Sequence, residues 1–360
     1  MSKAGKWLIA CGITVLLGLM AVAAIVILID PFFQYHKPLD NFPYVVDDQV
    51  DMNPGLAKNL DYDSVILGSS MVVNFNTAYV SENLNLNTVK LPYNGAYPKD
   101  QSNILDIIFK AKKDGIKRIF LGIDEMNYSG GVDETKFEIT DYLYDNNKLN
   151  DVSYIFNKDV LLDYCIRPVF DKKDKTDWDM IYPFWWQEEH YSKPLVLMYF
   201  EKVPVADKAP EAQPFIEAIK ENLDVNIIPY IEAHPETTFT IFFPPYSILY
   251  WDCVNNRKEL DVVIEKYRFM CEYLSAYKNV EIFFFQNNED IICNLNNYAD
   301  YTHYSPKICE YMVQCFADGS HRVTADNIEA TMENVEKELV ILYDLTSGYD
   351  YEAIWDDWYN

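Results

Sequence analysis

The chain opens with an unbroken apolar run from Trp7 to Ile29 that contains no charged residue. A helix of roughly 20 such residues crosses the hydrocarbon core of a bilayer, so the run is long enough to span a membrane. Lys3 and Lys6 precede the run and Asp30 follows it, and this charge distribution favours a cytoplasmic N-terminus. Three aromatic residues just after the run predict a belt at the membrane interface: Phe32, Phe33 and Tyr35.

A cleaved signal peptide is the alternative interpretation of this run. The small residues from Ala21 to Ala23 resemble a cleavage site, yet the apolar run continues beyond them to Ile29. We therefore expect a single-pass anchor in the cell membrane. The cytoplasmic N-terminus and the transmembrane helix occupy residues 1–30, and an extracytoplasmic domain occupies residues 31–360.

Beyond the membrane segment, short apolar runs alternate with segments of helical period, which is typical of a parallel α/β sheet. The runs are apolar on both faces, as buried parallel strands are. Five of them are predicted strands: Ser64–Leu67, Asn87–Leu91, Arg118–Ile123, Thr238–Phe243 and Val280–Phe285. Apolar residues at helical spacing predict two covering helices and a C-terminal helix. They are Ile104, Ile107, Ile108 and Ala111; then Leu260, Val263, Ile264, Tyr267, Cys271 and Leu274; and finally Ile328, Met332, Val335, Leu339 and Leu342.

The alternation of strand and helix is interrupted between about residues 128 and 234, where aromatic-rich and charge-rich segments predict an insertion. Its aromatic residues have two interpretations. They form a stacking surface for a sugar or a lid over a site, or they pack the insertion against the main sheet. We favour packing, because aromatic side chains carry large apolar area and most are buried for that reason. The residues concerned are Trp178, Trp185, Trp186, His190 and Tyr191.

Composition narrows the possible functions. With 49% hydrophobic residues, the 360-residue chain can bury a large core. Its formal net charge of −26 argues against a nucleic-acid partner, because phosphate binding depends on clustered Lys and Arg. Six cysteines lie outside the N-terminal apolar run, and their spacing leaves open whether they pair. We expect no metal and no cofactor, because the histidines outside the candidate site show no zinc-type spacing: His36, His190, His234 and His321.

The candidate chemistry lies in two segments that are far apart in the sequence. Gly68-Ser69-Ser70 follows the first strand, and Asp300 and His303 lie on a late loop that runs into a helix start at Ser305-Pro306. Loops after the carboxyl ends of parallel strands meet at one edge of the sheet, so these segments can come together. A serine, a histidine and an aspartate there supply a nucleophile, its base and the carboxylate that orients the base. In the simpler interpretation, Ser69 or Ser70 only caps the following helix.

These blocks resemble the SGNH or GDSL hydrolases. That family has a Gly-Asp-Ser-like block after its first strand and an Asp-x-x-His block before its last helix. The resemblance covers about Asp61 to Cys315 around the insertion, and it implies a three-layer α/β/α flavodoxin-like fold with a parallel sheet. It makes Ser70 the nucleophile, His303 the base and Asp300 its orienting carboxylate.

Two further blocks of the family concern the oxyanion hole. The second is a glycine whose backbone N–H joins the hole, and Gly95, in the turn after the second strand, matches it. The third is Gly-x-Asn-Asp, whereas this chain has Asp124 in place of the asparagine. An ionised carboxylate there would repel the negative charge that develops on the substrate. Asn127 or Asn94 can supply a donor instead, or Asp124 is a structural or substrate contact.

The N-terminal anchor narrows the resemblance to the membrane-tethered subset, which includes the alginate O-acetylation proteins and the teichoic-acid D-alanyl transfer protein. This implies a serine acyltransferase or esterase that acts on acyl esters of a cell-surface polymer. The expected partners are a polysaccharide or teichoic-acid-like acceptor and a membrane-bound acyltransferase. The alternative is a non-catalytic binding or assembly module on the same fold. We favour the enzyme, because Ser70, Asp300 and His303 are all present and only the third block is altered.

Overall fold

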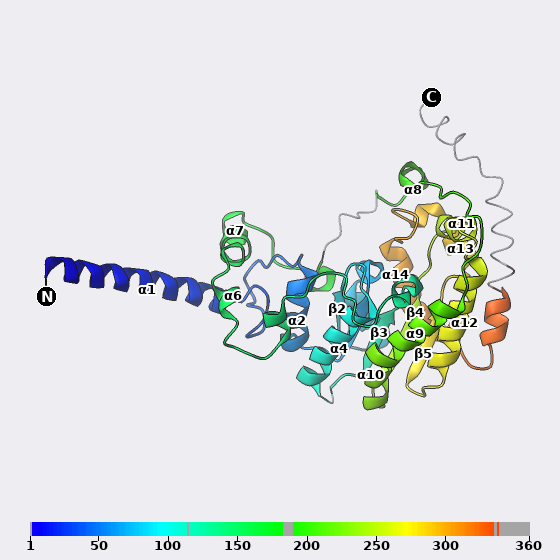
Figure 1. Ribbon diagram of the computed structural model, residues 1–360, viewed down its shortest axis with the longest axis horizontal. Helices are drawn as coiled ribbons and strands as arrows, with labels where there is room; N and C mark the ends of the chain where they lie inside the picture. Colours follow the sequence, from blue (N-terminus) through cyan, green and yellow to red (C-terminus); the bar gives the residue numbers. More distant parts are fainter. Residues whose placement is uncertain (1, 114, 183–189, 335–336, 338–360) are drawn as a thin grey trace, which may run out of the picture.

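Six strands form one sheet in the order β2-β1-β3-β4-β5-β6. The computed structural model describes residues 2–113, 115–182, 190–334 and 337 (Figure 1). Five strands are parallel, and the short β6 is antiparallel to β5. Their bounds are β1 Ser64–Gly68, β2 Thr88–Pro92, β3 Arg118–Gly122, β4 Thr238–Phe243, β5 Val280–Phe284 and β6 Arg322–Val323. The five predicted strands are confirmed to within one residue at each end, whereas β6 was not predicted.

The strand order reverses at β1. The chain passes from β1 out to the edge strand β2 and then returns to the other side of β1 as β3, so that Val65 pairs with both Val89 and Ile119. Connections that leave a sheet on either side of such a reversal open a crevice at the carboxyl ends of the strands. The segment that follows β1 begins with Ser69 and Ser70, and the segment that follows β3 contains Asp124.

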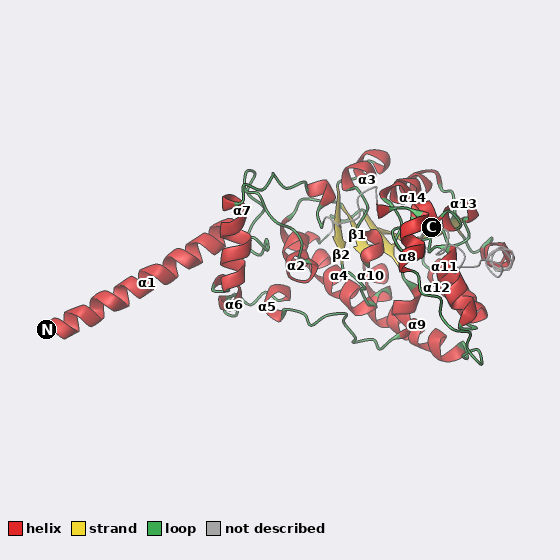
Figure 2. Cartoon of the chain, turned by 90° about the horizontal axis from the view of Figure 1, so that it is seen from above, coloured by secondary structure: helices red, strands yellow, loops and turns green. Residues whose placement is uncertain are grey.

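Helices cover both faces of the sheet, because neighbouring residues of a strand point to opposite sides. Phe242 of β4 packs against Phe316, and Phe243 packs against Tyr267. One group of helices lies on the Phe316 side: α3 Thr77–Leu84 and α14 Pro306–Asp318. The other group includes α2 Gln49–Asn59, α4 Pro98–Lys112, α9 Gln213–Asn226, α10 Ile228–Ala233 and α12 Leu260–Ser275 (Figure 2). The predicted helices around Ile104 and Leu260 are therefore confirmed as α4 and α12.

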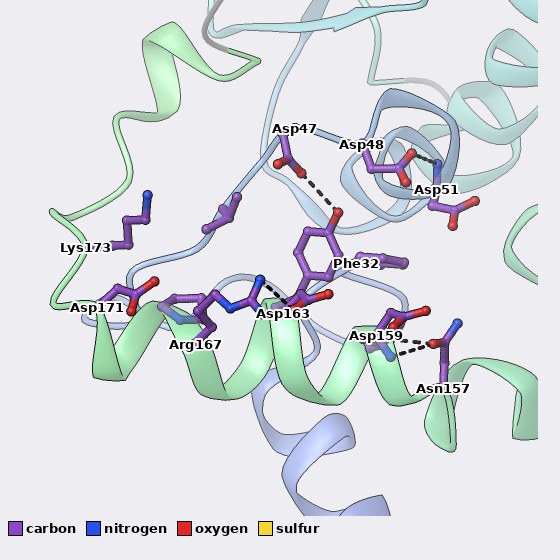
Figure 3. Close-up of a pocket in the computed structure, with 14 residues that line it drawn as sticks. Phe32, Asp47, Asp48, Asp51, Asn157, Asp159, Asp163, Arg167, Asp171 and Lys173 are labelled. Carbon is purple, nitrogen blue, oxygen red and sulfur yellow. Dashed lines mark hydrogen bonds and ion pairs between the residues drawn. The ribbon is translucent and has the colours of Figure 1, made fainter.

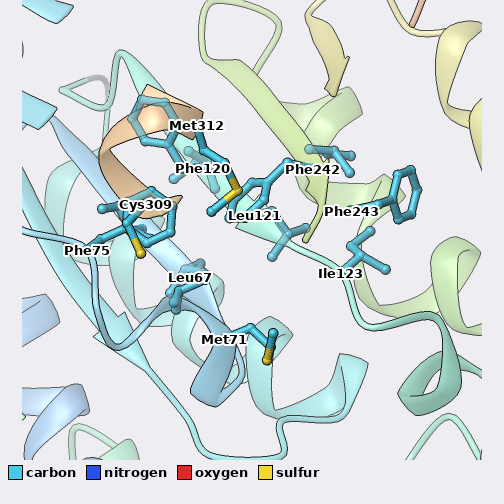
Figure 4. Packing of buried hydrophobic residues seen from close by; sticks show 14 of the residues in the cluster. Leu67, Met71, Phe75, Phe120, Leu121, Ile123, Phe242, Phe243, Cys309 and Met312 are labelled. Atoms are coloured by element: carbon cyan, nitrogen blue, oxygen red, sulfur yellow. The ribbon is translucent and has the colours of Figure 1, made fainter. Parts of the chain in front are cut away.

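The apolar core lies between these helices and the strands. Leu67, Phe120 and Phe242 from three strands meet Met312 and Cys309 of α14 in a closely packed cluster (Figure 4). All seven cysteines are free thiols, so this core is held without disulfides. Of the predicted C-terminal helix, Ile328 and Met332 are buried, while Val335, Leu339 and Leu342 lie outside the described residues.

The predicted insertion contains helices and turns but no strand in its described parts, residues 128–182 and 190–234. Its last portion contains α9 and α10; α9 packs on α4, α10 and α12, and both helices lie in the connection from β3 to β4. The remaining elements are α5 Asp141–Tyr144, α6 Val152–Ile155, the π-helical segment η3 Val160–Ile166, α7 Arg167–Phe170, η4 Trp178–Met180 and α8 Lys193–Tyr199. Elsewhere the chain forms η1 Ser70–Val72, η2 Glu125–Ser129, α11 Ile248–Asn256, α13 Glu289–Ile292 and η6 Leu295–Asn297.

Helix α1 (Lys3–Ile29) projects from one end of the molecule (Figure 1). Within the described residues it is the one helix long and apolar enough to cross a membrane. It ends at Asp30, whose buried carboxyl group accepts the backbone N–H groups of Gln34 and Tyr35 at 2.9 and 2.7 Å and the Tyr154 hydroxyl at 3.0 Å. The junction with the domain is therefore an ordered, hydrogen-bonded turn.

Two of the three aromatic residues after α1 do not form the predicted membrane belt. Phe32 and Phe33 are 4% and 0% exposed. Phe32 packs on Tyr154, and Phe33 packs on Trp178. The prediction was wrong for these two side chains, because the chain folds back at Asp30 and carries them into the domain.

Candidate active site

The serine turn after β1 depends on a glycine. Gly68 has φ 156°, and a Cβ there would lie 2.8 Å from Val72 Cγ1 and 3.2 Å from the carbonyl oxygen of Gly122. The Ser69 hydroxyl accepts the backbone N–H of Met71 at 3.2 Å and so caps η1. Because Ser69 performs the capping, the neighbouring Ser70 is left to make a different contact.

The structure brings Ser70, His303 and Asp300 together in one chain of hydrogen bonds. Ser70 Oγ lies 2.8 Å from His303 Nε2, and His303 Nδ1 lies 2.7 Å from Asp300 Oδ2. The other carboxylate oxygen accepts the backbone N–H groups of Thr302 and His303, both at 2.8 Å. Burial acts to raise the pKa of Asp300, but the hydrogen bonds and charge of His303 outweigh it and hold the pKa below its usual value. An ionised Asp300 is what a protonated imidazole needs beside it.

Reciprocal contacts hold the serine turn and the histidine loop at this distance. Asn74 donates its side-chain amide to the backbone oxygen of Tyr304 at 2.9 Å, and the Tyr304 hydroxyl donates to the backbone oxygen of Met71 at 2.5 Å. Within the loop, the backbone N–H of Ala299 donates to the oxygen of His303 at 2.9 Å. Ser70 and His303 are 233 residues apart in the sequence, yet the two segments that carry them fix each other's position.

A buried lysine stabilises the segment after the serine turn through hydrogen bonds. Lys90 of β2 is 1% exposed and donates to the backbone oxygens of Val73 and Phe75 at 2.6 and 2.9 Å. Burial lowers its pKa to about 8. Lys90 is not among the site residues predicted from the sequence, although a lysine inside an otherwise apolar strand is a signal for it.

Gly95 lies in the turn after β2, the strand that pairs with β1. Its φ of 68° is left-handed, a conformation that favours glycine. The backbone N–H groups of Ser70 and Gly95 donate to no acceptor among the described residues. Asn94 is held by its backbone N–H, which donates to Gln49 Oε1 at 2.7 Å.

The two polar residues predicted after β3 are both engaged inside the protein. Asp124 is 6% exposed, and the hydroxyl groups of Ser69 and Tyr246 donate to its carboxyl group. Burial raises the pKa of Asp124, against the effect of these hydrogen bonds and of the nearby His303. Asn127 donates its side-chain amide to the backbone oxygen of Ala96 at 3.1 Å. Asp124 therefore ties the residue before Ser70 to the segment after β4.

We expect Asp124→Asn to alter the pH dependence of stability. The pKa of Asp124 is raised by folding, so the wild-type folded state takes up a proton before the unfolded state does as the pH falls. As the pH falls from 7 to about 4, the wild type should therefore gain stability relative to the variant. The gain is about 1.4 kcal/mol for each unit by which the folded-state pKa exceeds the unfolded-state pKa. Urea unfolding of both proteins across that range measures the difference, and a difference independent of pH would contradict this electrostatic role.

A buried ion pair lies beneath Asp124. Glu125, the next residue, is 1% exposed and pairs with Lys266 of α12, which is also buried. The Tyr250 hydroxyl donates to the other oxygen of Glu125 at 2.8 Å. No local pattern in the sequence indicates this contact, because its partners lie more than a hundred residues apart.

The structure gives the contacts of two of the aromatic residues named for the insertion, Trp178 and Tyr191. Trp178 packs on Phe33 and Tyr44, with ring centroids 5.6 and 6.0 Å apart, and has a structural role. Tyr191 accepts a hydrogen bond from Asn74 at 3.0 Å and so lies beside the serine turn. His190 directly precedes it, and Trp185 and Trp186 lie outside the described residues.

A separate cavity of about 500 Å³ lies near the end of α1 and contains none of the three residues of the hydrogen-bonded chain (Figure 3). Its walls carry several aspartates, including Asp47, Asp48 and Asp163, with Arg167 among them. Within the described part of the chain, no group of three or more His, Cys, Asp or Glu side chains is placed to hold a metal ion.

The arrangement of Ser70, His303 and Asp300 suits nucleophilic attack on an acyl group, with Lys90, Asn74 and Tyr304 as its supports. Comparison with known proteins adds no assignment: no family model matches the chain, and no curated protein matches it significantly.

Proposed function

We propose that the protein is a membrane-anchored, extracytoplasmic serine acyltransferase or esterase that acts on acyl esters of a cell-surface polymer. The observation that carries this proposal is the continuous chain of hydrogen bonds from Ser70 Oγ through His303 to Asp300. Each link has the length expected of a nucleophile, its base and the group that orients the base.

The first half of the reaction forms an acyl-enzyme. Ser70 Oγ attacks the acyl carbonyl carbon while His303 Nε2 takes the hydroxyl proton, and the carbonyl electron pair moves onto oxygen. The free N–H groups of Ser70 and Gly95 stabilise that oxyanion. When the intermediate collapses, the C–O bond of the ester breaks, and His303 returns the proton to the departing alkoxide.

The second half transfers the acyl group. A hydroxyl group of the acceptor polymer, or water, attacks the acyl-serine while His303 removes its proton, and Ser70 is regenerated with that proton. Asp300 stays ionised throughout and stabilises the imidazolium. No cofactor takes part in this scheme.

Three further features support the proposal. The sheet order and the helices on both faces suit the three-layer, flavodoxin-like arrangement of SGNH-type hydrolases, which the blocks around Ser70 and His303 resemble. The apolar helix α1 suits a single-pass anchor with a cytoplasmic N-terminus. An anchored enzyme of this kind acts on a polysaccharide or teichoic-acid-like acceptor at the cell surface and can receive acyl groups from a membrane-bound acyltransferase.

One observation favours a second candidate, a binding or assembly module on the same fold. Asp124 occupies the position where the resembled family has an asparagine that donates to the oxyanion, and its carboxyl group is already bound by Ser69 and Tyr246. A site without the third donor can retain recognition while it loses catalysis.

A fluorophosphonate probe separates the two candidates. An activated Ser70 attacks phosphorus and expels fluoride, so we expect the folded full-length protein to be labelled at Ser70. Labelling should disappear in Ser70→Ala and persist in Ser69→Ala, the matched control from the same turn. Mass spectrometry of the labelled peptide identifies the serine. An unlabelled folded wild type would favour the binding module, and labelling that survives Ser70→Ala would reject Ser70 as the nucleophile.

A further inference from the structure

We propose that residues 148–175, here called the collar, lie in the lipid headgroup region beside the transmembrane anchor and hold the domain against the bilayer. This inference assumes that α1 spans the membrane, and it adds a second membrane contact made by the domain itself.

The collar packs against the end of α1. Helix α6, η3 and α7 follow one another and cross the end of α1 (Figures 1 and 2), with contacts from both α6 and η3. Val26, in the last turn of α1, is fully buried. The Tyr154 hydroxyl of α6 donates to Asp30 at 3.0 Å and fixes the two segments to each other.

The collar has two different faces. One face lines the cavity near α1 with polar residues such as Asp159, Asp163 and Arg167 (Figure 3). Away from the cavity the collar carries apolar side chains: Leu162, Val169 and Phe170 are 49%, 54% and 77% exposed, and none of them lines the cavity. Three more exposed apolar side chains precede them: Leu149 at 89%, Val152 at 54% and Phe156 at 43%.

The position of the collar identifies what covers these side chains. A span of roughly 20 residues that begins near Trp7 ends near Ile27, at the level where the collar packs. Leu28, the next residue of α1, is itself 67% exposed. The apolar side chains of the collar therefore adjoin a helix surface that the bilayer covers, and amphipathic segments at this depth bury their apolar face at the headgroup boundary.

The charge of the collar fits the same surface. The whole chain carries a formal net charge of −26, which disfavours contact with anionic lipid. The collar has six basic and five acidic residues and is therefore nearly balanced: Lys148, Lys158, Arg167, Lys172, Lys173 and Lys175 against Asp151, Asp159, Asp163, Asp171 and Asp174. Long basic side chains can lay their stems on apolar surface while their charge reaches the phosphates.

Photocrosslinking of the full-length chain in nanodiscs of phosphatidylglycerol and phosphatidylethanolamine tests the proposal. The photoreactive residue p-benzoyl-phenylalanine replaces Phe170 of the collar, Tyr199 of α8 or Leu16 of α1, one position at a time. Tyr199 is the matched control, because it is an aromatic residue with a similar exposure of 70% and lies far from α1 (Figure 1). Lipid adducts are measured by mass spectrometry. We expect a yield at position 170 at least about tenfold above that at position 199 and comparable with that at position 16.

The outcomes distinguish the collar from the anchor. Adducts at position 16 but none at position 170 would overturn the collar contact and leave the anchor intact. Absence of adducts at both positions would overturn both. Adducts of position 170 with protein, at the mass of two chains, would assign the collar to a protein interface and would equally overturn the lipid contact.

Discussion

Replacing His303 with alanine is expected to lower the turnover of an activated ester by about 10⁴-fold or more. His303 Nε2 lies 2.8 Å from Ser70 Oγ, so the variant loses the group that takes the serine proton. The serine hydroxyl is a weak nucleophile at neutral pH without such a base. The rate is measured with p-nitrophenyl acetate and the full-length protein in detergent, with Ser70→Ala as a second null variant.

His321→Ala is the control for this experiment. His321 is also a half-buried loop histidine, but its Nε2 contacts the Tyr311 hydroxyl at 2.8 Å and not the serine turn. The turnover of His321→Ala should stay within about threefold of that of the wild type, the range expected for a side chain outside the reacting groups. Equal rates for wild type and His303→Ala, with circular dichroism unchanged, would remove His303 from the mechanism.

The largest effect on stability is expected from Lys266→Met, which should lower the free energy of unfolding by about 3–5 kcal/mol. The variant leaves Glu125 as an unpaired carboxylate in a site that is 1% exposed. The Tyr250 hydroxyl still donates to it at 2.8 Å, but one hydrogen bond replaces little of the lost attraction. Urea unfolding followed by tryptophan fluorescence measures the loss.

The double variant Glu125→Gln with Lys266→Met is the matched control. It removes both charges, and the glutamine oxygen still accepts from Tyr250, so most of the lost stability should return. A double variant as unstable as Lys266→Met alone would show that packing around the lysine, and not the unpaired charge, determines the loss.

The sequence revealed the sheet because its strands are buried on both faces. Runs such as Ile119–Leu121 are apolar at every position, and this pattern depends only on local sequence. The two-residue strand β6 carries too few positions for any period to appear. The pattern places α9 within the insertion, because the aromatic-rich segments before it hide the alternation of strand and helix.

For the site, the sequence supplied the residues but not their supports. Ser70, Asp300 and His303 could be chosen because turn and helix-start signals place them at one edge of a parallel sheet. The contacts of Lys90 with the serine turn and of Tyr246 with Asp124 depend on how distant segments meet. Such contacts produce no periodic pattern in a single sequence, so they cannot be predicted from it.

The hydrogen-bonded turn at Asp30 has a mechanical consequence. A domain on a loose tether would sample many heights and orientations above a membrane, with an effective concentration set by tether length. Here the carboxyl group of Asp30 joins α1 to the residues that follow it and to Tyr154, and these contacts restrict the angle between the helix and the domain. The active site of the proposed enzyme would then stay at a nearly constant distance from the membrane. The enzyme would select acyl esters by their height above the lipid as well as by their chemistry.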